Sequence, residues 1–545
     1  MKAVRYSNKS IILFILMLFV LIGCNSQTSN EEDVSSTTDE TSEEATKDTK
    51  EEGENESEVS GEIVVAYSAQ PPVLDPHVST ADAISDTMRN VWDTLVTVDE
   101  DYNIQPLLAD SWDVSDDGKT YTFYLRENVL FHNGKELTAE DVVASMNRWK
   151  DAPSGKGIFL EATFEEVDDY TVTLNLPEPL STTLSTISHG GAGFAAIMPK
   201  EIIENAPEEG VAEYIGTGPF KFVEWKPDQH IHLTHFEDYK PRTEPTNGLA
   251  GKREALVKDL KFLFVSDSST REAGIRSGEY DFAHAVPFDN AEILESDPNI
   301  NNHTYPGGFL VVHFNKQKGF FTDEKARKAV AAALEMDSIM KAGYSDEKYY
   351  NLTHNFMMTH QHGFWHSDVG SEFYNVNDVD KAKQLLEEAG YNGEEIRLLT
   401  TRDYEDQYHG SVVIQEQLKQ IGMNVELEVY DWPTLLDMRE NPDLWEIFVI
   451  ANVAVPEPTL TGFLTSAYPG WTDSPKLDEL VDEFRSQPSL DDAQKMFDQF
   501  QEWYWDYMPV LKIGDYYRVS SSRSTLENFQ YQDGLIFWNV TNDKN

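Results

Sequence analysis

The sequence predicts an α/β protein of two or three domains, and three observations lead to this prediction. The chain has 545 residues, more than a single hydrophobic core usually serves. The apolar-rich run at residues 62–67 stops before Pro71-Pro72, which is typical of a buried strand. Residues 395–430 follow the order strand, helix and strand, the unit from which parallel sheets are built.

The N-terminus is typical of an export signal, because basic residues precede an unbroken apolar run at residues 11–22. These 12 residues would span about 18 Å as a helix, short of the roughly 30 Å hydrocarbon core of a membrane. Leu21-Ile22-Gly23-Cys24 resembles the lipobox of bacterial lipoproteins. The resemblance implies that residues 1–23 are a lipoprotein signal peptide and that Cys24 carries a diacylglyceryl anchor. The alternative is a chance cysteine beside an ordinary signal.

Residues 24–60 are expected to form the lipidated terminus and a disordered acidic linker. Residues 25–60 consist mainly of Ser, Thr, Glu, Asp and Lys and include no aromatic residue. Such a segment cannot bury enough apolar surface to offset the entropy that ordering costs. Its 36 residues would have an r.m.s. span of roughly 33 Å as a flexible coil. The alternative is a functional acidic tail.

The charge of the chain argues against nucleic acid as a partner. Asp and Glu number 96 against 43 Lys and Arg, which gives a formal net charge of -53. Affinity for nucleic acid depends largely on cationic side chains that neutralise phosphates, and the same acidic surplus repels anionic lipid. The single cysteine excludes an internal disulfide framework, so packing alone must stabilise the core.

In the first part of the body, the spacing of apolar residues predicts a helix over residues 81–98 and an alternating strand over residues 121–125. Asn133-Gly134 between two short apolar runs predicts a tight hairpin. His132 beside it is a candidate functional group, but we favour a hairpin residue whose ring is hydrogen-bonded.

Two further local signals follow. Thr138, with Asp141 three residues later, predicts a capped helix that extends to Trp149. Gly216-Thr217-Gly218 resembles part of a phosphate-binding loop. However, Pro219 follows it, and no Lys-Ser or Lys-Thr pair comes after the glycines. We therefore interpret these glycines as a tight backbone turn.

The second half contains the clearest strand–helix–strand unit. Residues 395–401 predict a strand, residues 411–421 a helix that Gly422 ends, and residues 423–430 a second strand. Further helices are expected near residues 477–484 and 493–507. Consecutive helical residues face different sides, so Trp503-Tyr504-Trp505 favours core packing over stacking on a sugar.

Ligands of such units sit beyond the carboxyl ends of the strands, and this rule selects three candidate residues. Arg402 and Tyr404 follow the first strand and Trp432 follows the second. Arg402 suits a bidentate clamp on a carboxylate, and a surface ion pair with nearby acids is an equal alternative. Trp432 is either a pocket wall or a core residue.

Short motifs follow one another in order from residue 107 onward. They are Leu108-Ala109-Asp110-Ser111-Trp112, Asp117-Gly118-Lys119-Thr120-Tyr121, Phe131-His132-Asn133-Gly134, Leu137-Thr138-Ala139-Glu140-Asp141-Val142, Gly216-Thr217-Gly218-Pro219-Phe220, Ser277-Gly278-Glu279-Tyr280-Asp281 and Val312-His313-Phe314-Asn315. This series resembles the extracellular solute-binding proteins of family 5, which serve ABC importers of peptides and nickel. The likeness covers nearly everything from residue 61 to the end.

The resemblance implies a two-lobed periplasmic-binding-protein-like type II fold with an extra domain inserted in lobe I. Lobe I would comprise residues 61–105, 216–310 and 510–545, the inserted subdomain residues 106–215, and lobe II residues 311–509. Ligand would bind between the lobes, and closure about a hinge would bury it. We then expect a monomer that is lipid-anchored outside the cytoplasm, with an ABC permease as its partner and without a cofactor.

The chain departs from peptide-binding members at one position. In those members, an aspartate in a segment like residues 451–464 pairs with the α-amino group of the ligand. Here Pro456-Glu457-Pro458 resembles the Pro-Asp-Pro of the family, which puts Ala454, or with a shifted register Asn452, in place of that aspartate. Neither is charged, and a buried ammonium without a carboxylate is costly. We expect either that Glu457 substitutes or that the ligand chemistry differs.

The remaining candidates are weaker. Phe309 and Asn315, in the segment expected to cross between the lobes, are candidate ligand-binding residues. His360, His362 and His366, with His354 nearby, suit nickel, copper or zinc by residue type, but no Cys or well-spaced carboxylate accompanies them. We favour loop histidines and predict no metal site.

Three functions were compared. The first is a lipoprotein receptor for a peptide or peptide-like solute, the second a receptor of the same scaffold for nickel or a metal chelate, and the third an exported hydrolase. The sequence has no His-Glu-x-x-His pair and no Gly-x-Ser-x-Gly elbow. We therefore expect a receptor and not an enzyme.

Overall fold

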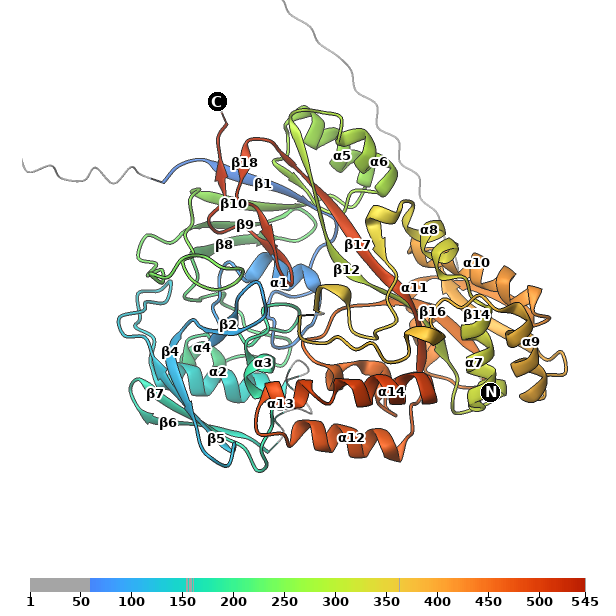
Figure 1. The fold of residues 1–545 in the computed structure, drawn as a ribbon. Helices are drawn as coiled ribbons and strands as arrows, with labels where there is room; N and C mark the ends of the chain where they lie inside the picture. Colours follow the sequence, from blue (N-terminus) through green and yellow to red (C-terminus); the bar gives the residue numbers. More distant parts are fainter. Residues whose placement is uncertain (1–58, 153–154, 156–158, 160, 362, 545) are drawn as a thin grey trace, which may run out of the picture. The chain divides into compact units, whose positions relative to one another are not determined.

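The structure is a computed structural model that describes residues 59–152, 155, 159, 161–361 and 363–544. These residues belong to one compact unit of strands and helices (Figure 1). The predicted signal peptide, Cys24, nearly all of the predicted linker and His362 lie outside the described residues. Within the described ranges, no helix has the length and apolar character needed to cross a membrane.

One large mixed sheet runs through this unit. In spatial order its strands are β15 (Asn424–Tyr430), β14 (Glu395–Thr401), β16 (Ile447–Asn452), β12 (Ile300–Phe314), β17 (Val510–Arg523), β11 (Phe282–Ala283), β1 (Glu62–Tyr67), β10 (Asp259–Phe264), β9 (His230–His235) and β8 (Phe220–Lys226), and β13 (Tyr350–Asn351) pairs with β17 off this path. The two longest strands, β12 and β17, are antiparallel neighbours that cross the molecule side by side (Figure 1). They connect the strands around β1 with the strands around β14.

Three large hydrophobic cores accompany this sheet. The first core gathers around β1, β10 and the C-terminal segment and includes Ile63, Phe262 and Phe537. The second core gathers around β12, β14 and β16 and runs from Phe309 to Tyr516. A third core lies between residues 95 and 197. Each core buries one set of elements, and the long strands β12 and β17 run between the first core and the second.

The predicted strand over residues 62–67 is confirmed, but the predicted helix over residues 81–98 is too long. Helix α1 spans only Asp82–Met88, and Val96–Val98 form strand β2, which pairs with β3 (Ile104–Pro106). Apolar residues of the predicted helix are still buried, among them Trp92 and Leu95. The spacing therefore identified buried positions correctly but not the backbone that carries them.

The glycine turn explains where helix α1 ends. The backbone N–H groups of Gly218 and Phe220 donate to the carbonyls of Val91 and Asn90 at 2.9 and 3.0 Å. A Cβ at Gly216 would lie 2.0 Å from the Val91 carbonyl oxygen, so only glycine permits this approach. The carbonyls that would continue the helix are engaged by this turn, and the interpretation of the glycines as a backbone turn is confirmed.

The third core is covered by a separate antiparallel sheet. Its order is β4 (Ala109–Val114), β5 (Thr120–Leu125), β7 (Thr171–Asn175) and β6 (Thr163–Asp168), and helix α2 (Ala139–Asp151) packs on it. The predicted capping box of Thr138 and Asp141 is present at the start of α2. Tyr121, Phe123 and Leu125 are buried, as their alternation predicted.

His132 is a structural residue, as favoured from the sequence. Its Nε2 lies 2.9 Å from the Gly218 carbonyl oxygen, and its Nδ1 accepts from the Gly216 N–H at 3.2 Å. Burial lowers the pKa of His132 to about 4, so the ring is neutral and ties the hairpin to the glycine turn.

The strand–helix–strand unit is confirmed with one correction. β14 and β15 are parallel neighbours, but helix α10 spans Glu405–Gln420 and begins six residues before the predicted start. Two acidic residues, Glu405 and Asp406, occupy its first turn, where they interact favourably with the helix dipole. The first turn lacks the spaced apolar residues on which the prediction relied, so the predicted helix began too late.

The C-terminal helices are α12 (Pro475–Arg485), α13 (Leu490–Gln494) and α14 (Phe497–Tyr507), so the predicted helix over residues 493–507 is divided in two. Trp503, Tyr504 and Trp505 are all buried, which confirms core packing. The remaining helices are α3 (Thr183–Ile187), α4 (Lys200–Glu204), α5 (Ser268–Ser277), α6 (Phe288–Leu294), α7 (Glu324–Ala333), α8 (Met336–Tyr344), α9 (Val379–Glu388) and α11 (Trp432–Arg439). The remaining strands are β18 (Leu526–Glu527), β19 (Gln530–Tyr531), β20 (Leu535–Ile536) and β21 (Thr541–Asn542).

Candidate functional site

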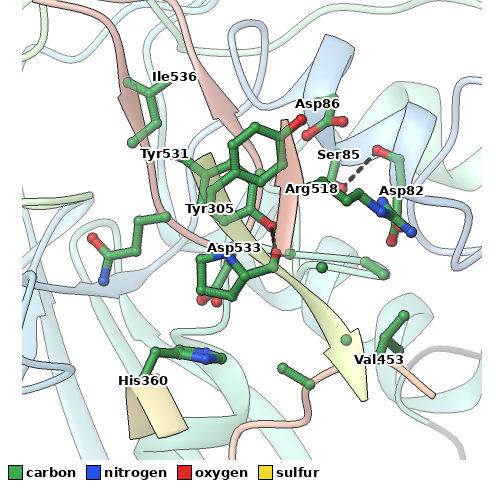
Figure 2. A pocket seen from close by; sticks show the side chains of 18 of the residues that line it. Asp82, Ser85, Asp86, Tyr305, His360, Val453, Arg518, Tyr531, Asp533 and Ile536 are labelled. Carbon is green, nitrogen blue, oxygen red and sulfur yellow. Dashed lines mark hydrogen bonds and ion pairs between the residues drawn. The ribbon is translucent and has the colours of Figure 1, made fainter. Parts of the chain in front are cut away.

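A cavity of about 480 Å³ is lined by residues from both sides of the long strands (Figure 2). Tyr305 and Tyr531 come from the first-core side, and Met358 and Ala454 from the second-core side. The volume falls within the range of ordinary small-molecule sites. The charged side chains that line it are Asp82, Asp86, Glu100, Asp533 and Arg518, so acids outnumber the single guanidinium.

Asp86 lines the cavity, and both of its carboxylate oxygens accept hydrogen bonds from the protein. Its Oδ2 accepts from the Tyr67 hydroxyl at 2.5 Å and its Oδ1 from the Leu535 N–H at 2.8 Å. Burial raises the pKa of Asp86, although the nearby Arg89 guanidinium opposes that shift. With both oxygens engaged, Asp86 holds the C-terminal segment against α1.

Arg518 is the cationic group of the cavity. It projects from β17, and its guanidinium lies 3.5 Å from Asp82 Oδ2 on α1; Figure 2 shows the two side by side. Both side chains are more than one third exposed, so the ion pair itself contributes little to stability. The Arg518 guanidinium therefore remains available to a ligand.

A stacked aromatic pair forms another wall. The rings of Tyr305 and Tyr531 lie 4.1 Å apart at an angle of 17°, and Figure 2 shows them together. The Tyr305 hydroxyl bonds Ser520 at 2.6 Å, and the Tyr531 hydroxyl donates to the Pro306 carbonyl at 3.2 Å. Both hydroxyls are tied to β12 and β17, which fixes the wall to the long strands.

A tight turn carries Asp533 into the cavity. β19 and β20 pair as a hairpin, and residues 532–534, the C-terminal turn, connect them. Asp533 and Gly534 have φ values of 50° and 140°, and such positive values favour Asn, Asp and Gly. The buried Arg89 donates to the carbonyls of Gln532, Asp533 and Gly190 and so fixes the turn.

The carboxylate of Asp533 has one engaged oxygen. Its Oδ1 accepts from the Tyr102 hydroxyl at 3.0 Å, and its Oδ2 lies 3.7 Å from His189 Nδ1. Its side chain is 12% exposed. Among the residues that the structure describes, no hydrogen bond reaches Oδ2, so this oxygen can accept from a ligand.

Three histidines line the cavity in their neutral form. Burial lowers the pKa of His189, His284 and His360, and for His189 and His360 the carboxylate of Asp533 partly opposes the shift. His284 stacks on Tyr67 at 4.2 Å. Neutral rings leave the acids of the cavity without a histidine cation near neutral pH.

A smaller cavity of about 40 Å³ adjoins the first. Both are lined by Tyr102, His189, Ala454 and Asp533, so these four residues mark where they meet. The other walls of the smaller cavity are mostly apolar and include Phe364, Trp365 and Leu490.

The loop that follows β16, residues 453–458, is here named the β16 loop. Val453 and Ala454 line the main cavity, whereas Asn452 ends β16 and does not. Glu457 is only 1% exposed, and its two oxygens accept from the Thr459 N–H and hydroxyl at 2.5 and 2.6 Å. Glu457 is thus the cap of a short 3₁₀ turn over Pro458–Leu460 and lines neither cavity.

Tyr404 and Trp432 lie together, and neither they nor Arg402 line either cavity. The Tyr404 and Trp432 rings make an edge contact at 5.0 Å. Arg402 stacks on Tyr408 at 4.6 Å and donates to its hydroxyl, in place of the ion pair considered from the sequence.

Phe309 lies within β12, and Asn315 directly follows the end of that strand. Phe309 is buried beneath the Lys512 ammonium at 5.1 Å, and Asn315 donates to the carbonyls of Pro442 and Trp445. Both act as structural contacts in this arrangement.

Three histidines of the predicted group, His354, His360 and His366, are among the described residues. His354 Nε2 lies 2.7 Å from the Ser367 carbonyl oxygen, His366 lies 3.5 Å from Asp368, and His360 lines the main cavity. Across the described part of the chain, no group of three His, Cys, Asp or Glu side chains is placed to hold a metal.

Sequence reasoning did not find Asp533, Arg518 or the tyrosine wall. Asp533-Gly534 between apolar runs is itself a hairpin signal and would have drawn attention to the C-terminal turn. No local pattern marks Arg518 or Tyr305, because their role depends on pairing of two strands that lie about 200 residues apart in sequence.

Comparison with known proteins places this geometry in context. The model of bacterial extracellular solute-binding proteins, family 5 (middle part), matches residues 103–473. The probable peptide ABC transporter periplasmic-binding protein y4tO of Sinorhizobium fredii is 30% identical over 490 residues, which cover 86% of this chain and 91% of that protein.

Solved structures give the same result for the fold. The ABC transporter substrate-binding protein CtaP of Listeria monocytogenes matches with a TM-score of 0.75 and 23% identity over 86% of this chain and 95% of that one. The periplasmic binding protein DppA of Helicobacter pylori, solved with the peptide STSA, matches with a TM-score of 0.73 and 25% identity over 89% and 99% of the chains. The predicted two-lobed α/β binding-protein fold is confirmed.

Proposed function

This chain belongs to the bacterial extracellular solute-binding proteins of family 5, and on that premise we propose that it is an ABC importer receptor that captures a peptide or peptide-like small solute. Members of this family bind solutes and are not enzymes, so the expected mechanism is capture and release without chemistry. The relatives named for peptide transport or solved with a peptide support the substrate class.

The observation that carries the proposal is the cavity between the first-core and second-core sides. Its volume of about 480 Å³ and its lining by both acids and Arg518 suit a small zwitterionic or polar ligand. The two sides are joined by β12 and β17, so relative movement about these strands opens or closes the site. The closed form, stabilised by ligand contacts to both sides, is then the form that the permease recognises.

The anchoring and organisation of the chain complete the proposal. Cys24 carries two acyl chains after removal of residues 1–23, residues 25–60 tether the body, and the protein acts as a monomer outside the cytoplasm. The lobes have the boundaries expected from the sequence: residues 61–105, 216–310 and 510–545 for lobe I, 106–215 for its insertion and 311–509 for lobe II. Metabolic labelling with palmitate tests the anchor in cells that express wild type or Cys24→Ser. Only the wild type is expected to incorporate the label.

Binding of nickel or a metal chelate remains the second function considered. The arrangement of the described residues does not favour it, because no group of three His, Cys, Asp or Glu side chains among them is placed to hold a metal. Free peptide is therefore the first ligand to test.

A thermal-shift screen of the mature chain from Asn25, made without the acyl group, tests the function. The panel holds di- to pentapeptides, their N-acetylated forms, amino acids, polyamines, neutral sugars and nickel with and without histidine. A receptor shows a raised melting temperature with one class and returns that ligand unchanged. Turnover of a panel member, or no shift with any peptide or related solute, would contradict the proposal.

A further inference from the structure

We propose that Asp533, on the C-terminal turn, receives the cationic amino group of the ligand in place of a residue from the β16 loop. This inference rests on the proposed function and makes it more specific, because it assigns an ammonium-bearing solute to the cavity. It also assigns recognition of that group to a segment that the sequence motifs did not single out.

The β16 loop presents no charge to the cavity. Its lining residues are Val453 and Ala454, and its one acid, Glu457, is buried with both oxygens bonded to Thr459. To reach a ligand, Glu457 would have to give up the cap of its 3₁₀ turn. An ammonium beside Val453 and Ala454 would need its carboxylate from elsewhere, because an unpaired buried charge is costly.

Three other acids line the cavity, and each is less suited than Asp533. Asp86 has both oxygens engaged by Tyr67 and Leu535. The Asp82 side chain is 47% exposed, so solvent screens its charge. Glu100 is exposed to solvent, where a single ion pair contributes little.

Asp533 combines burial with an open acceptor. Its side chain is 12% exposed, the Tyr102 hydroxyl occupies Oδ1, and among the described residues no hydrogen bond reaches Oδ2. His189 Nδ1 lies 3.7 Å from Oδ2, and burial lowers the pKa of His189, so this ring is neutral near pH 7. An ammonium at Oδ2 would meet a carboxylate oxygen that no described residue hydrogen-bonds, in surroundings that screen its charge weakly.

The turn that holds Asp533 is fixed before any ligand arrives. Arg89 is buried and donates to the carbonyls of Gln532, Asp533 and Gly190, and the Gln532 N–H donates to the Gly534 carbonyl. Preorganisation of this kind reduces the entropy lost on binding. The guanidinium contacts the carbonyl of Asp533, which leaves the carboxylate free to face the cavity.

Ala454 and Asp533 line the same two cavities. Asp533 can therefore meet a ligand amino group that lies beside the uncharged Ala454. Both residues border the main cavity and the smaller one, together with Tyr102 and His189. The smaller cavity, about 40 Å³, has room for roughly three water molecules and has largely apolar walls. A short aliphatic group next to the ammonium fits there, so a peptide that begins with valine is the appropriate first probe.

The test measures binding by calorimetry for Val-Leu-Ala and N-acetyl-Val-Leu-Ala, with putrescine and a neutral sugar as further probes. The variants are Asp533→Asn, which keeps the shape and the acceptor for Tyr102, Asp533→Glu, which keeps the charge, and Glu100→Gln, which removes a different acid from the same cavity. We expect Asp533→Asn to reduce the affinity for Val-Leu-Ala by roughly thirtyfold or more. Asp533→Glu should reduce this affinity by less, and Glu100→Gln by under about threefold. The acetylated probe should bind weakly and equally to wild type and Asp533→Asn.

Each other outcome has a defined meaning. The inference is wrong if the affinity of Asp533→Asn for Val-Leu-Ala is within about threefold of that of wild type. It is also wrong if this variant loses affinity equally for the free and the acetylated peptide while its melting temperature is unchanged. If wild type binds only probes without an amino group, the inference is wrong and the receptor function stands. If wild type binds no solute of the full screening panel, the proposed function itself fails, and this inference fails with it.

Discussion

The β16 loop and the C-terminal turn line the same cavity, and they differ in what they offer a ligand. The β16 loop presents Val453 and Ala454 and keeps its acid, Glu457, as a buried cap. The C-terminal turn presents Asp533 with one oxygen that no described residue bonds. The difference teaches that a carboxylate near a site matters to a ligand only if its oxygens are not already engaged by its own backbone.

The largest expected effect concerns the support of the turn. Arg89→Met removes a buried guanidinium that bonds three carbonyls of residues 190, 532 and 533. We expect the free energy of unfolding to fall by about 3–5 kcal/mol, because the three carbonyls lose their donor and the buried Asp86 loses the neighbouring cation. Denaturant unfolding measures this loss. Arg402→Met, which removes an exposed guanidinium that stacks on Tyr408, is the matched control and should cost about 0.5 kcal/mol or less.

The second prediction separates stability from binding at the β16 loop. Glu457→Ala removes the cap of the turn at Pro458–Leu460 and should lower the free energy of unfolding by about 1 kcal/mol. Affinity for Val-Leu-Ala should stay within about twofold of wild type. A large loss of affinity with little loss of stability would show that Glu457 does contact the ligand and would reverse the comparison.

The third prediction concerns pH. Asp533 is faced by His189 and His360, by the Tyr102 hydroxyl and, from behind, by Arg89. Burial lowers the pKa of both histidines below 6.5, so they are neutral from about pH 6.5 upward and become cationic only as the pH falls further. Protonation then competes with the ligand ammonium.

We therefore expect affinity for Val-Leu-Ala to be highest near pH 6.5–7. It should fall toward pH 8, because the peptide's own α-amino group loses its proton with a pKa of about 7.7–8.0, and it should fall several-fold toward pH 5 as the two histidines become cationic. Calorimetry across this range measures the effect, and Asp533→Asn should show a weaker dependence. Affinity that keeps rising as the pH falls from about 6.5 to 5 would be inconsistent with a free-amine ligand at Asp533.

The fourth prediction has the smallest effect. Ala454→Asp in the Asp533→Asn background returns a carboxylate to the shared border of the two cavities. We expect a partial recovery of affinity for the free-amine probe, of about threefold to tenfold, because the turn that holds Asp533 is more rigid than the loop. Recovery for the acetylated probe as well would indicate a change of shape and not of charge.

Much of the fold could be predicted from the sequence, and the failures have physical causes. Strands β1 and β14 and the capping box of α2 match their local patterns, because alternation and capping act over a few residues. The helix predicted over residues 81–98 is interrupted because the glycine turn, more than 120 residues later, bonds the carbonyls of Asn90 and Val91. No local pattern carries that information.

The site candidates of the sequence and the lining of the cavity differ. The strand-end rule brought Tyr404 and Trp432 together, and neither they nor Arg402 line the cavity. The residues that do line it come from α1, β12, β17 and the C-terminal turn, and they meet only through long-range pairing. The uncharged Ala454 was identified from the sequence as an oddity, and the structure adds the acid that shares its cavities.

A crystal structure of the mature chain with Val-Leu-Ala tests the central claim most directly, since it shows which group meets the ligand ammonium. We predict the peptide in the cavity between the two sides, with its amino nitrogen about 2.7–3.0 Å from Asp533 Oδ2. An amino nitrogen bonded to Glu457 or to the carbonyls of the β16 loop, with Asp533 bonded only to Tyr102, would contradict the account.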